Sequence, residues 1–498
     1  MIVSSYVNAA FPAVAVSTAE EERFKTELLD AYPERPVFSI AATGGLKDAR
    51  TGNVIDGQAT YPKAFAIAAS REQSLLLVFD WQHVCRNAAA YRALKDVFDV
   101  LKRQGSCIIL VAPSWSLPAE LEHDVPVIEY ALPTRIQLDA ALRIVASSAG
   151  TEIDDQTTSA CLNAAAGLTL QEAENAFALT LVESANAGNL HFDADRIEQE
   201  KMRLVKQSGY LEVWPPADPS MVGGLDRLKD YFTDEVMPSR DDPDLRVRGI
   251  LLVGVPGTGK SLAAKAAGSL LGWPVLRMDV AALKGSLVGQ SESNMRAALK
   301  LADAVAPAIC WIDEIEKGVG GFASSAHTDS GVTLGMVGAL LTWMQEHTSP
   351  VIVIATCNDY QKLPAELTRA GRFDERFFVD LPTRNERTAI ANVHLNRFNC
   401  PSAFLADSIS EMTDGWTGAE IEQLVKSAAR RTNRQPTLDV LKECAKDIKP
   451  ISRVRAQEID ALRQWARDSL RIANSPANSP DEISPSGRRL HIGGSNGN

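Results

Sequence analysis

Residues 254–261 have the residue types and spacing of a phosphate-binding loop. They read Gly-Val-Pro-Gly-Thr-Gly-Lys-Ser and match Gly-x-x-x-x-Gly-Lys-Ser without a mismatch. Glycines let the backbone curl so that its N–H groups point at phosphate oxygens, and a helix N-terminus adds positive potential. Lys260 can reach the β- and γ-phosphates, and the Ser261 hydroxyl can hold Mg²⁺. The nucleotide-binding residues predicted here are Pro256, Gly257, Thr258, Gly259, Lys260, Ser261 and Leu262.

Two carboxylates, Asp313 and Glu314, follow the apolar run 309–312. In an open α/β sheet, ligands bind at the carboxyl ends of the strands. Asp313 is expected to contact Mg²⁺, directly or through water, and Glu314 to act as base or orienting group for the attacking water. Asn358 follows the apolar run 351–356 and should emerge beside Glu314, where a neutral amide orients water without repelling phosphate. Together with Lys260, these residues predict hydrolysis of Mg-ATP.

The elements that must position these residues follow an α/β pattern. From about 219 to 383, short β-rich apolar runs alternate with helix-length amphipathic stretches, which predicts a three-layer parallel sheet of the P-loop NTPase class. Residues 384–472 are predicted to form a helical lid and a C-terminal helix. Residues 1–205 are predicted to be a separate α/β domain, and the proline-containing segment 206–218 a linker. Residues 473–498 have almost no apolar content and are predicted to be a disordered tail.

The series of motifs resembles the AAA family of ATPases over roughly residues 219–435. Met221–Leu225 looks like the family's segment that lies against adenine, and Asn358 fits its sensor position. A histidine and a Gly-Ala pair resemble the lid residues that lie near the ribose and touch the nucleotide. The nucleotide contacts that this resemblance implies are Val222, Gly223, His394, Gly418 and Ala419.

Leu363–Asp374 looks like the second region of homology of the same family, whose two arginines reach the ATP of the neighbouring subunit. Arg369 and Arg372 are therefore candidate trans-acting arginine fingers. Two arginines can stabilise the charge on a transferring phosphoryl group. Action in trans implies a homo-oligomer, for which a closed ring is the natural solution and a hexamer the expected size.

Within this family the chain is similar to a narrower group of AAA ATPases encoded in some algal chloroplast genomes, with cyanobacterial and other bacterial relatives. The likeness covers most of the chain, and it is carried by Gly249–Lys265, Val288–Arg296, Leu341–Glu346 and Ile459–Arg467.

The resemblance predicts coupling of ATP hydrolysis to the remodelling of an unidentified protein partner. The position aligned with the family's pore loop reads Leu287-Val288-Gly289, so leucine stands where an aromatic ring would grip a threaded chain. A glycine-rich stretch, 318–327, is a second pore-loop candidate. The missing aromatic favours one alternative, an ATP-gated scaffold or assembly factor without threading. A nucleic-acid motor or clamp is the other alternative, which the net charge of −12 disfavours without excluding it.

The first domain contains echoes of the second. Leu132–Arg135 and Leu381–Arg384 share the sequence Leu-Pro-Thr-Arg, and Leu168–Glu174 stands where Trp416–Glu422 stands in the later copy. We hypothesise that residues 1–205 are a degenerate AAA-like domain without a phosphate loop. The glycine-rich stretch Thr43–Lys47 lacks the required spacing.

Composition agrees with a globular protein of two or three domains, with 498 residues of which 45% are hydrophobic. The seven cysteines are scattered and none is paired as Cys-x-x-Cys, which predicts buried, reduced thiols and a cytoplasmic location. No apolar stretch approaches the length of a membrane span, so no membrane association is expected.

Overall fold

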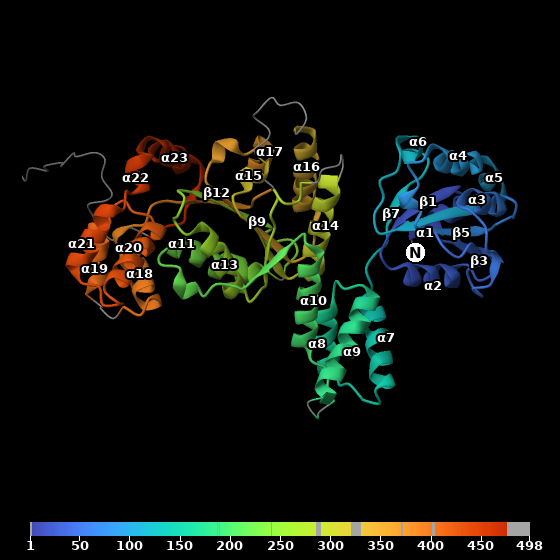
Figure 1. Ribbon diagram of the computed structural model, residues 1–498, viewed down its shortest axis with the longest axis horizontal. Helices are drawn as coiled ribbons and strands as arrows, with labels where there is room; N and C mark the ends of the chain where they lie inside the picture. The colour runs from blue at the N-terminus through green and yellow to red at the C-terminus, as the bar shows by residue number, and fades with distance from the viewer. Residues whose placement is uncertain are drawn as a thin grey trace, which may run out of the picture. The chain divides into compact units, whose positions relative to one another are not determined.

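The computed structural model describes residues 2–186, 188, 190–240, 242–284, 290–319, 330–369, 372–400 and 404–475. The chain divides into two compact units, residues 1–198 and 199–498, and the division falls inside helix α10 (Ala194–Ser208). In the described part of the chain, each unit is built around its own seven-stranded sheet (Figure 1).

The sheet of the second unit has the order β14-β13-β9-β12-β11-β10-β8. Its strands are β8 (Glu212–Trp214), β9 (Gly249–Gly254), β10 (Val275–Arg277), β11 (Ala308–Ile312), β12 (Val351–Cys357), β13 (Glu375–Val379) and β14 (Arg471–Ile472). All neighbours are parallel except β8, which runs antiparallel to β10. When β9 to β13 are numbered in chain order, their spatial order is fifth, first, fourth, third, second.

Helices cover both faces of this sheet, because successive residues of a strand point to opposite sides. Leu251 and Val253 of β9 pack into one core cluster with α14 and α16, while Ile250 and Leu252 pack into another with α13. Strands buried on both faces explain the continuous apolar runs in the sequence. The helices of this region are α11 (Asp226–Tyr231), α12 (Met237–Ser239), α13 (Lys260–Leu271), α14 (Gln290–Val305), α15 (Ile315–Val319), α16 (Ser330–Glu346) and α17 (Ala365–Thr368).

The helical lid is a bundle with its own core, visible as one group of helices in Figure 1. It consists of α18 (Arg384–Arg397), α19 (Leu405–Met412), α20 (Gly418–Arg431) and α21 (Leu438–Asp447). Capping boxes start α18 at Thr383 and α20 at Thr417, where each threonine exchanges hydrogen bonds with the glutamate three residues later. The chain then returns to the sheet through α22 (Ile451–Val454) and α23 (Ala456–Ser469) and ends its described part beyond β14.

The sheet of the first unit repeats this strand order. Its strands are β1 (Ala13–Ser17), β2 (Val37–Ile40), β3 (Leu46–Asp48), β4 (Val54–Asp56), β5 (Leu75–Phe79), β6 (Cys107–Ala112) and β7 (Val127–Glu129), in the order β4-β3-β2-β5-β6-β1-β7. The parallel strands β1, β2, β5, β6 and β7, numbered in chain order, again lie fifth, first, fourth, third, second.

The helices that follow also correspond. Thr134 starts α7 with a capping box, as Thr383 starts α18, and Thr169 exchanges hydrogen bonds with Glu172 at the start of α9. The common strand order and caps support the hypothesis of a degenerate repeat. The helices of this unit are α1 (Ile2–Asn8), α2 (Glu21–Ala31), α3 (Tyr61–Ala69), α4 (Ala88–Asp96), α5 (Phe98–Gln104), α6 (Ala119–Glu122), α7 (Arg135–Ser148), α8 (Asp155–Ala165), α9 (Leu170–Asn186) and α10.

Two predicted boundaries differ from the structure. The segment 206–218, predicted to be a linker, holds the end of α10 and the strand β8, and Leu211 lies in a core cluster of the second unit. The predicted tail 473–498 begins with ordered residues, because Ala473 is fully buried and Asn474 nearly so. Both segments are ordered by contacts with distant parts of the chain, because β8 pairs with β10 and the Ala473 N–H donates to the Phe378 carbonyl oxygen.

All seven cysteines are free thiols and buried. Burial raises the pKa of Cys107 and of Cys310 to about 12 and that of Cys161 to about 11. Among the described residues, no helix is long and apolar enough to cross a membrane.

Candidate active site

The phosphate loop connects the buried strand β9 to helix α13. Gly257 and Gly259 have φ angles of +81° and +98°, a backbone conformation that favours glycine. Gly257 also lies against the lid, since a Cβ there would meet the Ala419 Cβ and the Thr417 Oγ1 at 3.2 Å. The Ala419 N–H donates to the Gly257 carbonyl oxygen at 3.1 Å. The loop is therefore held by the lid as well as by the sheet.

Lys260 is almost completely buried, with 5% of its surface exposed. Its ammonium group donates to the carbonyl oxygens of Gly254 at 2.9 Å and Val255 at 2.8 Å. Burial lowers the pKa of Lys260 to about 8, although the nearby acids oppose this shift. The ammonium group thus lies inside the loop, bonded to two carbonyl oxygens. A bound phosphate would raise the pKa of Lys260 again, because a nearby negative charge favours the charged form.

Asp313 and Glu314 emerge where β11 ends. One Asp313 carboxylate oxygen accepts hydrogen bonds from Ser261 Oγ and from Thr356 Oγ1, both at 2.7 Å. Glu314 has a left-handed φ of +48°, and its N–H donates to Thr356 Oγ1 at 2.9 Å. This cluster of hydroxyls and a carboxylate supplies the oxygen ligands that Mg²⁺ prefers. The residues present therefore fit a magnesium ion.

The Glu314 carboxylate is held from two sides. Asn358 Nδ2 donates to one oxygen at 2.9 Å, and Lys317 forms an ion pair with the other. The Asn358 N–H in turn donates to Glu316, a buried acid, at 3.1 Å. The predicted pairing of Asn358 with Glu314 is thus present in the geometry.

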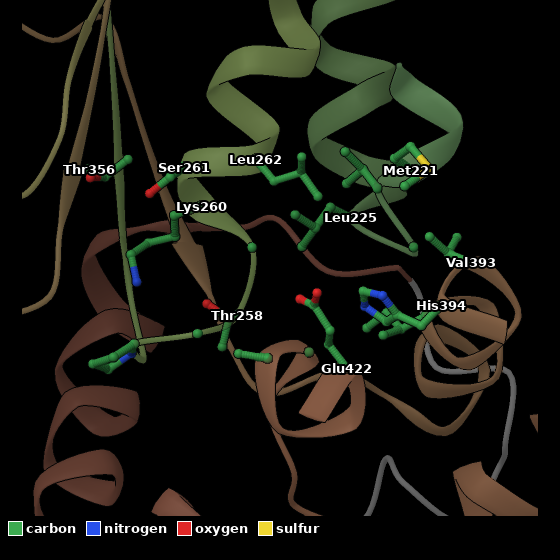
Figure 2. Close-up of a pocket in the computed structure, with 18 of the residues that line it drawn as sticks. Met221, Leu225, Thr258, Lys260, Ser261, Leu262, Thr356, Val393, His394 and Glu422 are labelled. Carbon is green, nitrogen blue, oxygen red and sulfur yellow. The ribbon is translucent and has the colours of Figure 1, made fainter. Parts of the chain in front are cut away.

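These groups border one cavity of about 460 Å³ between the phosphate loop and the lid. Figure 2 shows Lys260 and Ser261 on one side of it and His394 and Glu422 on the other. The predicted residues that line it are Val222, Gly223, Pro256, Gly257, Thr258, Gly259, Lys260, Ser261, Leu262, Asp313, Glu314, Asn358, His394, Gly418 and Ala419. Sequence reasoning assigned no role to five more lining residues: Thr356, Ile390, Val393, Arg397 and Glu422.

His394 offers a buried polar atom to whatever fills the cavity. Its Nδ1 has no hydrogen-bond partner in the described part of the chain. Burial lowers the pKa of His394, although Glu422 opposes this effect. A neutral ring with an unpartnered nitrogen at the lid side fits a ligand with hydroxyl groups there, as a ribose has.

Two further groups of predicted residues lie elsewhere. Arg369 is exposed, and Arg372 donates to the Leu341 carbonyl oxygen; neither is among the residues that line the cavity. The pore-loop residues Leu287, Val288 and Gly289 lie outside the described residues, as do residues 320–327 of the second glycine-rich candidate.

The first unit has an ion pair where the second has its phosphate loop. Residues 18–20, which join β1 to α2, contain no glycine, whereas the glycines of Thr43–Lys47 lie in the turn between β2 and β3. The Glu20 carboxylate accepts the Leu170 N–H, at the start of α9, at 2.6 Å and pairs with Arg23 at 2.7 Å. Both side chains are less than a tenth exposed. In the first unit, the Glu20 carboxylate thus links the segment after β1 to helix α9.

Comparison with known proteins agrees with this geometry. A family model described as "ATPase family associated with various cellular activities (AAA)" matches residues 250–381. Over 489 residues the chain is 30% identical to the "Uncharacterized AAA domain-containing protein ycf46" of Guillardia theta, a match that covers 94% of this chain and 95% of the relative. The chain belongs to the AAA ATPase family.

Other matches extend over both units of this AAA ATPase. The family models "SpoVK-like AAA ATPase, N-terminal domain" and "SpoVK-like AAA ATPase, second domain" match residues 2–130 and 136–208. The ycf46 protein of Gracilaria tenuistipitata var. liui is 33% identical over 410 residues, with 79% of this chain and 82% of the relative covered. "ATP-dependent zinc metalloprotease FtsH 2" of Bdellovibrio bacteriovorus is 34% identical over 193 residues, 38% of this chain and 31% of the relative.

Among solved structures, the FIGL-1 AAA domain in complex with ADP matches 56% of this chain and 98% of that chain, with 23% identity and a TM-score of 0.46. The matching AAA family model and the strand order β13-β9-β12-β11-β10 identify an α/β P-loop NTPase fold, and the reaction of this AAA ATPase is the hydrolysis of ATP to ADP and phosphate.

Proposed function

We propose that this ATPase acts as a homo-oligomeric ring, expected to be a hexamer, in which each ATP is hydrolysed with arginines from the neighbouring subunit, and that the energy remodels a protein partner. The observation that carries the proposal is the distribution of cations. Among the described residues that line the cavity, Lys260 is the single cation beside the phosphate loop, because Arg397 lies on the lid with its ion-pair partner Glu422. Arg369, by contrast, is exposed and lies outside the cavity lining.

The residues beside the phosphate loop have separate tasks in this proposal. Lys260 and the loop amides bind phosphate, and Ser261, Thr356 and Asp313 form the oxygen cluster that would hold Mg²⁺. Bound Mg²⁺ supplies charge neutralisation on the phosphates. Glu314 takes the proton of the attacking water, and Asn358 fixes the orientation of that carboxylate.

A mixing experiment tests action in trans. Arg369→Ala should lower kcat by about a thousandfold or more, the range for a lost arginine finger. Glu314→Gln should bind ATP and hydrolyse it orders of magnitude more slowly. Mixed subunits should regain activity, because an Arg369→Ala subunit keeps Glu314 and its Glu314→Gln neighbour supplies Arg369. Arg92→Ala, which removes an exposed arginine of the first unit, is the matched control. A mixture as inactive as its components would contradict trans action.

The nature of the partner is tested with the Glu314→Gln variant as a trap in the presence and absence of ATP. ATP-dependent capture of a protein client supports remodelling, whereas self-assembly alone supports the ATP-gated scaffold. The nucleic-acid alternative would need a basic strip, for which the sequence offers arginines near 430 and 455. Arg431 pairs with Asp447 at 2.9 Å and Arg455 with Glu458 at 3.6 Å, which offsets their charge. Salt-dependent binding of DNA or RNA would support the nucleic-acid alternative.

A further inference from the structure

The lid contains a buried carboxylate that joins three segments of the chain: its own helix α18 and two distant segments that donate hydrogen bonds to it. Glu386, near the start of α18, has only 2% of its surface exposed. One of its oxygens accepts the N–H of Leu225 at 2.9 Å and both the N–H and hydroxyl of Ser475, at 2.8 and 3.1 Å. The other accepts Asn474 Nδ2 and the Thr383 N–H, each at 2.9 Å. A buried charge requires this number of donors, since it has lost its hydration.

Two of the three segments line the nucleotide cavity. Val222, Gly223 and Leu225 border it from the segment before α11, and α18 contributes Ile390 and His394. The packing between these two segments is tight. A Cβ on Gly223 would lie 2.7 Å from the Ile390 backbone nitrogen, and one on Gly224 would lie 2.4 Å from the Glu386 Cγ. Glu386 therefore lies directly behind the wall that the base would contact, and Figure 2 shows Leu225 and His394 of that wall.

The third segment is the C-terminal stretch Ala473–Ser475. It continues β14, which pairs with β13, and the Ala473 N–H donates to the Phe378 carbonyl oxygen at 2.9 Å. Asn474 Oδ1 accepts the Asp380 N–H at 2.8 Å while its amide group donates to Glu386. The segment is thus fixed to the sheet at one end and presents its polar groups to Glu386 at the other.

We propose that Ala473–Ser475 is a positioning part of the nucleotide site, which acts through Glu386 to hold the wall of the base-binding end in place. The proposal rests on the assignment of the cavity to ATP. Asn474 and Ser475 supply three of the five donors to Glu386 and do not line the cavity themselves. Without them, the carboxylate is left buried and short of donors, and its bond to Leu225 no longer has one fixed geometry.

The consequence is specific to the base end. ATP should bind more weakly when the wall formed by 222–225 is displaced, whereas the phosphate loop and the catalytic pair are untouched. A loss of binding free energy that is equal in the ground state and the transition state raises KM and leaves kcat unchanged. Inorganic triphosphate contacts the phosphate loop and has no base, so its affinity should not change.

The test compares steady-state kinetics of Asn474→Ala and Ser475→Ala in the full-length chain. We expect Asn474→Ala to raise the KM for ATP roughly tenfold, the effect of about 1.4 kcal/mol, with kcat and the inhibition constant of inorganic triphosphate unchanged. Ser475→Ala, which keeps the backbone donor, should give a smaller rise. Glu411→Gln, an exposed acid of the lid, is the matched control.

Two results would overturn the proposal. One is an unchanged KM for ATP in an Asn474→Ala variant whose urea-unfolding midpoint shows that it is folded. The other is a parallel loss of triphosphate affinity, which would show a general loosening of the unit. Trans action is read from recovery of kcat in mixed subunits, so the proposed oligomeric mechanism and the C-terminal positioning role can fail separately.

Discussion

Thr356→Val removes one hydroxyl from the candidate active site and keeps a β-branched side chain of similar shape. Thr356 is 1% exposed and lies near the end of β12. Its hydroxyl donates to Asp313 and accepts the N–H of Glu314, so it joins the carboxylate proposed to hold Mg²⁺ to the carboxylate proposed to activate water. The substitution therefore tests whether this link positions the two acids.

The size of the effect follows from two lost interactions. A hydrogen bond to a charged acceptor contributes about 1.5–3 kcal/mol, and a buried N–H left without a partner costs about 1–3 kcal/mol. Part of this loss appears in the free energy of unfolding. If about 1.4–2.8 kcal/mol is lost only in the transition state, kcat falls about 10- to 100-fold.

Steady-state ATPase rates and urea unfolding of the same preparations separate the two parts. Thr356→Ser keeps the hydroxyl and should keep most of the activity. Ile354→Val on the same strand removes a buried methylene group, costs about 0.5–1.5 kcal/mol of stability, and should leave kcat unchanged. Wild-type kcat in Thr356→Val, or an equal loss in Thr356→Ser, would refute the role of the hydroxyl.

Two further predictions concern buried charges. Lys260 has a pKa of about 8 without nucleotide, and a bound phosphate favours its charged form. The affinity for ATP should therefore fall as pH rises through about 8, and binding of ATP near that pH should take up protons. Calorimetry in buffers of different ionisation enthalpy measures this uptake, and binding without proton uptake would contradict the prediction. Glu20→Ala leaves Arg23 buried without its closest acid and should lower the free energy of unfolding of the first unit by about 3–5 kcal/mol. Urea unfolding against the exposed Glu22→Ala checks this, and equal midpoints would show that the ion pair contributes nothing.

The cavity-lining residues of the phosphate loop and of the ends of β11 and β12 could be predicted from the sequence because their signals are local. The phosphate loop needs eight consecutive residues, and the acids and Asn358 directly follow apolar runs. The strand order of the first unit also agrees with the repeat inferred from Leu-Pro-Thr-Arg. These features depend on periodicity and turn chemistry, which a single sequence displays.

The features that sequence reasoning missed depend on partners far along the chain. Glu386 reads as an ordinary capping-box residue, and its other donors come from positions 161 and 88 or 89 residues away. Trp214 of β8 lies in a proline-rich stretch, yet it packs edge-to-face on Trp311 with ring centroids 5.6 Å apart. The sequence of a small polar or proline-rich segment predicts disorder, because the residues that it packs against are far away in the chain.

The burial of all seven cysteines has a practical consequence for distance measurements in solution. Thiolate is the reactive form, and buried thiols with raised pKa values react slowly with maleimides at neutral pH. A cysteine introduced at an exposed position such as Glu22 or Glu411 should therefore react with a dye or spin label faster than the buried native thiols. Pairs of such labels would report how the lid moves during turnover without prior removal of any native cysteine.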